Sequence, residues 1–183
     1  KQKYPTATSK ADLIERGLMV ERARLFVIDG GKGIRKAIRD VFTDWARVQR
    51  CQVHKLRNVL DHLPEGKRSW ARTLLREAWG SDSEEVARRR LHALARQLES
   101  KHPGAAASLR EGLDETLTVL SLGLHGALAR TLRSTNPIEN LQGLLKRVTR
   151  NVKRWRGGAM ARRWAATALM EAEKSFRKVR GFR

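Results

Sequence analysis

The chain has 183 residues, which suits one domain, or one domain with a sizeable insertion. Hydrophobic residues make up 40% of it, so a packed core is expected and a wholly disordered chain is excluded. The 39 Lys and Arg against 19 Asp and Glu give a net charge of +20, which indicates a polyanionic partner, with nucleic acid the better candidate. We find no apolar run near 18 residues and no signal peptide, so we expect no membrane association and a cytoplasmic, nucleoid-associated protein.

The amino-terminal part is predicted to contain a strand, a helix and a second strand. A short amphipathic helix is expected over residues 11–20. Residues 25–28 are apolar on both faces, which is typical of a buried parallel strand. Residues 47–53 are predicted to form the second strand, so the unit is βαβ. The helix between the strands has apolar residues at helical spacing: Ile34, Ala37, Ile38, Val41 and Phe42.

Residues 55–133 are predicted to be helical throughout. Apolar stripes at helical spacing end at Pro64 and at Gly80, and the second stripe includes Trp70. Ser81 and Glu84 are predicted to form a capping box for the next helix. Pro103 is predicted to open a helix that carries apolar residues as far as Leu120.

A further helix is predicted to begin within residues 133–140. Asn136 can cap it, Pro137 fits its first position, and Glu139 follows the cap by three residues. Glu139 therefore has two interpretations: a capping-box residue, or a metal-binding carboxylate at the edge of the apolar stripe of Ile138, Leu141, Leu145 and Val148.

Asp29 and the pair Cys51 and His54 are the other candidate site residues. Asp29 directly follows an apolar strand, and functional groups gather at the carboxyl ends of such strands. Gly30–Gly33 lacks the Ser or Thr of a phosphate-binding loop. Cys51 and His54 have zinc-like spacing, but the chain contains one cysteine, so we expect neither an internal disulfide nor a zinc site. A buried thiol beside a His that ends a strand, or a His that contacts phosphate, are the remaining interpretations.

Residues 141–183 are strongly basic, with Glu only at positions 171 and 173. Residues 153–158 are predicted to form a loop between two basic helices. Basic side chains neutralise phosphates, and an indole can stack on an unpaired base. For Trp155 and Trp164 taken singly, core packing is the favoured interpretation. The candidate DNA-binding residues are His54, Lys146, Arg147, Arg150, Lys153, Arg154, Trp155 and Arg156.

Four segments occur in an order that resembles the mutator family of bacterial insertion-sequence transposases. They are Val27–Gly30, Gln49–Val59, Ser134–Glu139 and Arg147–Trp155. The resemblance runs from about residue 10 to the end. It implies an α/β, mostly helical fold: part of an RNase H-like domain with an all-helical insertion. The implied parts are residues 1–55 (sheet and helix), 56–133 (insertion) and 134–183 (the helix of the catalytic Glu and basic helices).

The resemblance also implies a site and a reaction. Asp29 would be the second, and Glu139 the third, acidic residue of a triad that binds Mg²⁺, which Mn²⁺ could replace. Cys51 and His54 match the Cys-x-x-His element of the family. The full enzyme would bind double-stranded DNA at the terminal repeats, cleave a strand and join it to target DNA, and it is expected to be a homodimer.

The first acidic residue of that triad has no counterpart in this sequence. Asp12 precedes Asp29 within a helical pattern, so the role is not assigned to it. We therefore expect the chain to be the carboxyl-terminal part of a transposase and to be inactive alone. One alternative is a non-catalytic remnant that binds element ends or interferes with the full-length enzyme. Another is an unrelated basic helical protein that binds DNA or RNA.

Overall fold

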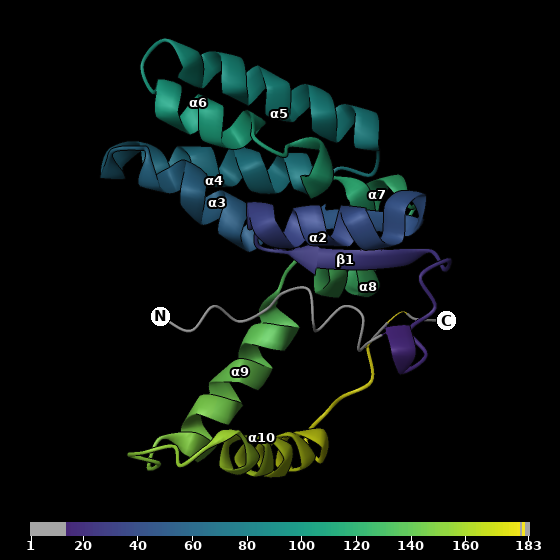
Figure 1. Cartoon of the computed structure of the whole chain (residues 1–183). Helices are drawn as coiled ribbons and strands as arrows, with labels where there is room; N and C mark the ends of the chain where they lie inside the picture. Colours follow the sequence, from purple (N-terminus) through teal and green to yellow (C-terminus); the bar gives the residue numbers. More distant parts are fainter. Residues whose placement is uncertain (1–13, 180, 182–183) are drawn as a thin grey trace.

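A computed structural model of the chain describes residues 14–179 and 181. Helices dominate, and they surround a two-stranded parallel sheet (Figure 1). No helix among the described residues has the length and apolar character needed to span a bilayer. The amino-terminal elements are β1 (Arg24–Ile28), α2 (Lys32–Phe42), η1 (Thr43–Trp45), β2 (Ala46–Arg50) and α3 (Gln52–Asp61). Those that follow are α4 (Glu65–Trp79), α5 (Glu84–Glu99), α6 (Pro103–Arg110), η2 (Asp114–Thr116), α7 (Thr118–Ser121), α8 (Gly126–Leu132), α9 (Asn136–Thr149) and α10 (Gly158–Glu173).

The predicted βαβ unit is confirmed. β1 and β2 pair in parallel, from Arg24 opposite Ala46 to Ile28 opposite Arg50, and α2 forms the crossover that parallel strands require. Ile38 and Phe42 of α2 are buried on the sheet, where the ring centroid of Phe42 lies 4.7 Å from that of Phe26. Figure 1 shows α2 along one face of the sheet and α8 on the other side of it.

Two predicted elements have different ends. The second strand was predicted over 47–53 but ends at Arg50, because Cys51 is already the N-cap residue of α3. The Cys51 N–H still bonds the Ile28 carbonyl of β1, at 2.7 Å. His54 therefore lies in the first turn of a helix and does not end a strand. Of the helix predicted over 11–20, residues 11–13 lie outside the described residues. Ile14 and Glu15 are helical, and Gly17, with φ of 94°, ends the turn.

The central helices enclose one large apolar cluster that runs from Val59 to Leu120. Its members include the stripes predicted around Leu60, Leu75 and Leu91, although Trp70 is exposed. The prediction that Ser81 and Glu84 form a capping box is wrong, because Ser83 is the N-cap residue and no side chain caps α5. The helix predicted to run from Pro103 to Leu120 is divided into α6, η2 and α7, because Gly112 takes a positive φ of 65° after α6.

α9 and α10 pack on each other and extend away from the other helices (Figure 1). The predicted loop between them is confirmed, since residues 152–157 are neither helix nor strand. The prediction that Asn136 caps α9 is wrong, because Thr135 is the N-cap residue and Asn136 and Pro137 begin the helix. The apolar stripe of α9 is not a core face either, because no residue of this helix is buried. The boundaries 1–55, 56–133 and 134–183 stay predictions.

Two buried cations, Arg50 and Lys55, join the sheet to the central helices. The Arg50 guanidinium donates to both carboxylate oxygens of Glu111, at 3.2 and 3.0 Å. The fully buried Lys55 ammonium donates to the carbonyl oxygens of Ser108, at 2.6 Å, and Glu111, at 2.5 Å. Gly30 leaves room for this arrangement: its φ is 108°, and a Cβ there would lie 2.3 Å from the guanidinium carbon of Arg50.

Both partners of this junction have shifted pKa values. Burial and the nearby Arg50 charge lower the pKa of Lys55, while Glu111 opposes the shift. The hydrogen bond from Arg50 lowers the pKa of Glu111, although partial burial acts in the other direction. The Glu111 carboxylate therefore stabilises the fold above its unfolded-state pKa, and this stabilisation is lost as the pH falls through the folded-state pKa.

Glu111→Gln is expected to lower the free energy of unfolding at neutral pH by about 1–3 kcal/mol, because two buried cations lose their counter-charge. The loss should begin to shrink as the pH falls below the unfolded-state pKa of a glutamate, about 4.3, and should vanish once the pH has passed the lowered folded-state pKa. Urea denaturation over a pH series measures both effects. Glu99→Gln is the matched control: Glu99 is 51% exposed, like Glu111 at 52%, but it pairs with the exposed Arg110. Equal effects of the two substitutions would contradict the prediction.

Candidate active site

One cavity brings together the residues predicted to carry chemistry. It has a volume of about 490 Å³ and is lined by residues from β1, α2, α3 and α9. Its lining residues are Val27, Ile28, Asp29, Ile34, His54, Thr135, Ile138, Glu139 and Gln142. Asp29 and Glu139, which are far apart in the sequence, therefore share a cavity at the carboxyl end of β1.

Asp29 reaches the cavity because β1 ends at Ile28 and the chain turns sharply at Gly30 and Gly31. The side chain is exposed, and one carboxylate oxygen accepts a bond from the Gly31 N–H at 3.3 Å. This bond holds the carboxylate at the strand end. Ile34, expected in the core, instead lies in the first turn of α2 and forms an apolar wall of the cavity.

Glu139 lies in the first turn of α9 and does not act as a capping-box residue, because no side chain caps this helix. The Thr135 hydroxyl donates to its carboxylate. The Nδ1 atom of His54 lies 3.7 Å from the same carboxylate oxygen and 3.3 Å from the Thr135 hydroxyl. Thr135 and His54 thus hold the Glu139 carboxylate at the wall of the cavity.

Cys51 connects His54 and Thr135, the two neighbours of Glu139, to the sheet. Its thiol is fully buried, as one interpretation of the sequence had it. The sulfur lies 3.3 Å from the Nδ1 atom of His54 and from the Thr135 hydroxyl, and 3.4 Å from the Thr135 backbone nitrogen. Burial is the largest single influence and raises the pKa of the thiol, but the hydrogen bonds from Thr135 and His54 together outweigh it and lower the pKa.

The side chains of this cavity that could bind a metal ion are Asp29, Glu139 and His54. Within the described residues, no group of three or more His, Cys, Asp and Glu side chains is placed to hold a metal. Cys51 and His54 touch each other but form only half of a zinc site. Mg²⁺ needs less from a protein, because it keeps several waters and is held by one or two carboxylates together with substrate phosphates. The two carboxylates of this cavity fit that requirement.

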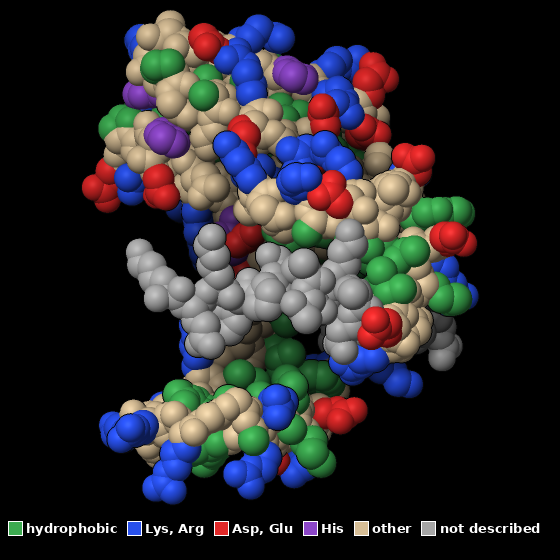
Figure 2. Space-filling view, in the orientation of Figure 1, with side chains coloured by type: hydrophobic (Ala, Val, Ile, Leu, Met, Phe, Trp, Pro, Cys, Tyr) green, Lys and Arg blue, Asp and Glu red, His purple; other side chains and the backbone are tan. Residues whose placement is uncertain are grey.

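The predicted DNA-binding residues other than His54 are all exposed on α9 and the loop after it. Figure 2 shows Lys and Arg side chains over the part of the molecule that contains α10. Between residues 146 and 179, within the described part of the chain, one ion pair forms, from Lys174 to Glu171. The other cations of this segment are therefore available for a polyanion.

Two parts of the site were not expected from the sequence. Thr135 was not singled out, although it lies inside the Ser134–Glu139 segment, and its hydroxyl meets Cys51, His54 and Glu139. Core packing was favoured for Trp155 and Trp164, and this prediction is wrong: they are 47% and 37% exposed. The concentration of Lys and Arg around both indoles was the signal that could have indicated exposure.

Thr135→Val is expected to raise the pKa of the Cys51 thiol, because it removes a hydrogen bond that stabilises the thiolate. The change is measured as the pH at which thiolate ultraviolet absorbance appears, with Cys51→Ser as the blank for this single-cysteine chain. Thr131→Val is the control, since the Thr131 hydroxyl bonds the Ala127 carbonyl within α8. A shift to lower pH, or the same shift in the control, would contradict the role of Thr135.

Nearly all of the chain is similar to proteins of one family. Residues 9–179 match the family described as "Transposase, Mutator family". The transposase for insertion sequence element IST2 of Acidithiobacillus ferrooxidans is 32% identical over 143 residues, which cover 78% of this chain and 47% of that protein. The transposase for insertion sequence element IS256 in transposon Tn4001 of Staphylococcus aureus is 29% identical over 163 residues, which cover 87% of this chain and 40% of that protein.

The transposase for insertion sequence element IS6120 of Mycolicibacterium smegmatis is 32% identical over 139 residues, covering 74% of this chain and 42% of that protein. The chain thus spans less than half the length of these relatives. The family match, by contrast, covers nearly all of the chain. This chain therefore belongs to the mutator family of transposases.

Proposed function

We propose that this chain forms part of a transposase that cleaves and transfers DNA strands at insertion-sequence ends. One observation carries the proposal: Asp29, at the end of β1, and Glu139, in the first turn of α9, line one cavity. Relatives that are 32% identical to this chain are insertion-sequence transposases by name. We further propose that β1, α2, β2 and α9 belong to an RNase H-like domain, and that the chain is inactive without the rest of the protein.

Asp29 and Glu139 would hold Mg²⁺, or Mn²⁺ in its place. When bound, the ion supplies charge stabilisation for phosphoryl transfer between attacking and leaving oxygens. The chain's own groups prepare this site. The Gly31 N–H holds the Asp29 carboxylate, and the Thr135 hydroxyl holds that of Glu139. Ile34 and Ile138 form the apolar part of the cavity lining.

Double-stranded DNA would lie along the basic surface that leads from this cavity. Lys146, Arg147 and Arg150 lie on or just after α9, the same helix that carries Glu139, so phosphates bound there place the strand toward the carboxylates. Lys153, Arg154 and Arg156 extend the surface into the loop. His54, at the cavity wall, would contact a phosphate close to the site. In the full-length protein we expect two copies to act together, one on each element end.

Iron-directed cleavage of the polypeptide tests the metal site without requiring DNA chemistry. Fe²⁺ bound in place of Mg²⁺ reduces added hydrogen peroxide to hydroxide and a hydroxyl radical, which cuts the chain close to the ion, and added ascorbate returns the Fe³⁺ to Fe²⁺. Cuts are expected near residues 29 and 139, and excess Mg²⁺ should suppress them. Asp29→Asn or Glu139→Gln should raise the metal concentration needed by at least about tenfold, since even outer-shell substitutions cost 10–100-fold.

Glu85→Gln is the control for this experiment, because Glu85 is an exposed carboxylate on α5 that pairs with Arg89. It should leave the cuts unchanged. Cuts near only one of the two carboxylates, or a pattern that neither substitution alters, would refute a shared metal.

A second candidate is a protein that binds DNA without cleaving it. It is favoured because no group of three or more side chains among the described residues is placed to hold a metal ion together. Such a protein would bind element ends, or pair with a full-length copy and block it. Intact DNA affinity together with a negative result in the iron experiment would favour this candidate.

DNA affinity measured at several salt concentrations tests the basic surface, which both candidates require. Replacing Lys153 and Arg154 with Gln should weaken duplex binding and reduce the slope of log affinity against log salt by about 1 per lost phosphate contact. Arg72→Gln, on the exposed side of α4, is the control and should leave the slope unchanged. An unchanged slope in the double variant would place the DNA elsewhere on the protein.

A further inference from the structure

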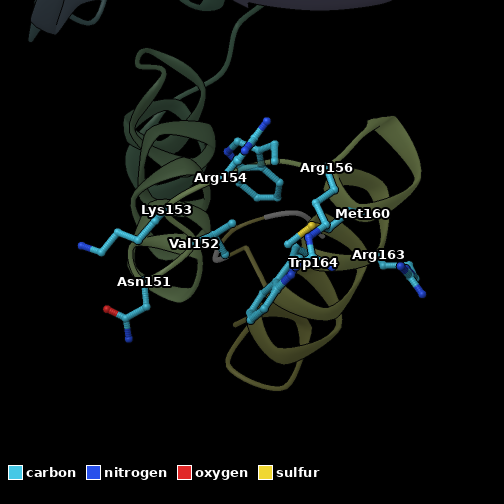
Figure 3. Close-up of a pocket in the computed structure, with 9 residues that line it drawn as sticks. Asn151, Val152, Lys153, Arg154, Arg156, Met160, Arg163 and Trp164 are labelled. Carbon is cyan, nitrogen blue, oxygen red and sulfur yellow. The ribbon is translucent and has the colours of Figure 1, made fainter.

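A large open cavity lies at the loop between α9 and α10, apart from the carboxylate site. Its volume is about 1040 Å³, and its lining combines four cations with two indoles and no acidic side chain. The lining residues are Asn151, Val152, Lys153, Arg154, Trp155, Arg156, Met160, Arg163 and Trp164. In Figure 3, Trp164 lies near Met160 and Arg156, while Lys153 and Asn151 extend outward on the opposite side.

The two indoles are not engaged by other rings or by cations. Among the described residues, the one ring pair is Phe26 with Phe42, and the one cation over a ring is Arg24 above Phe42. Trp155 and Trp164 therefore stack on no other ring among the described residues, and both are substantially exposed. An exposed indole retains an apolar face in water, which stacking on another flat aromatic group would cover.

The charge around the indoles restricts what can cover them. Lys153, Arg154, Arg156 and Arg163 have no ion-pair partner among the described residues, so the occupant must bring negative charge as well as a flat apolar surface. A nucleotide has both, as phosphate and as base. Bases inside a duplex are already stacked on their neighbours, so only an unpaired base offers its face to an indole.

We propose that this cavity, at the α9–α10 loop, binds unpaired nucleotides of a DNA strand by stacking their bases on Trp155 and Trp164. The inference rests on the proposed function in that DNA is the ligand, but it does not involve the metal site. The Lys and Arg side chains track the phosphates, and the indoles hold the bases. The cavity thus distinguishes a single strand, or a locally opened duplex, from an intact duplex.

Equilibrium binding of a fluorescent oligothymidylate and of a duplex of equal length, at one salt concentration, tests the proposal. Trp155→Ala and Trp164→Ala should each weaken single-strand binding by about tenfold, since stacking on an aromatic side chain contributes strongly for each base. Duplex binding should change by less than about twofold. Trp155→Phe and Trp164→Phe should restore most of the single-strand affinity, because a phenyl ring still stacks.

Two matched controls exist in the chain. Trp45 is 47% exposed, like Trp155, and Trp70 is 41% exposed, close to Trp164, yet neither lines the cavity. Their Ala variants should bind the single strand as the wild type does. In addition, abasic sites in the oligonucleotide should weaken single-strand binding of the wild type more than that of the Trp155→Ala variant, which has one indole fewer to lose. Thermal unfolding of each variant identifies any Ala variant that has lost its fold. For such a position, the Phe variant and the abasic oligonucleotide test the stacking instead.

Equal losses on single strand and duplex, or losses no greater than in the Trp45 and Trp70 controls, would overturn the inference. The same holds if abasic sites affect the wild type and the Ala variants alike. These outcomes leave the proposed function standing, provided that the wild type binds duplex DNA. A wild-type chain that bound neither form of DNA would refute both proposals.

Discussion

The candidate site depends on the short segment from Arg50 to Lys55, where β2 ends and α3 begins. Its backbone completes the sheet through the bond from Cys51 to Ile28, and it meets the approach to α9 through the bond from Gln52 to the Arg133 carbonyl at 2.9 Å. Its two cations hold the central helices through Glu111. One segment thus fixes the strand that carries Asp29, the helix that carries Glu139 and the helical block between them in the sequence.

Burying two cations beside a half-exposed carboxylate is costly unless every donor finds a partner. The structure meets much of this requirement with backbone carbonyls as well as with Glu111, since the Lys55 ammonium bonds both Ser108 and Glu111 carbonyls. A second set of polar contacts also joins β2 to the central helices. The buried Gln49 amide bonds the Thr116 carbonyl at 3.0 Å and accepts from the Val119 N–H at 2.8 Å, and the Thr118 hydroxyl bonds the Val48 carbonyl at 2.6 Å. Such directional contacts define one position for the helical block relative to the sheet, which apolar contacts alone specify less well.

The carboxyl-terminal helices α9 and α10, in contrast, are weakly packed. α10 buries only Ala168 and Ala172, and α9 buries nothing, so the pair contributes little to the core. Its unpaired cations repel one another in the free protein, and a polyanion relieves this repulsion. The same lack of burial leaves Trp155 and Trp164 exposed. A helical pair that is weakly packed and strongly charged is suited to a role in binding, while the rigid β1–β2 unit and α3 position the carboxylates.

Local patterns in the sequence determined the parallel βαβ unit, the apolar stripes of α3 to α5, the loop after α9 and the family, because side-chain periodicity and ordered motifs act over short distances. The sequence also singled out Asp29 and Glu139. Only the tertiary structure decided that they line one cavity, that Thr135 and His54 orient Glu139, and that Arg50 and Lys55 converge on Glu111. It also decided that Trp155 and Trp164 stay exposed. Periodicity identifies the apolar face of a helix but not whether another element covers that face, and contacts between residues eighty positions apart depend on how the whole chain packs.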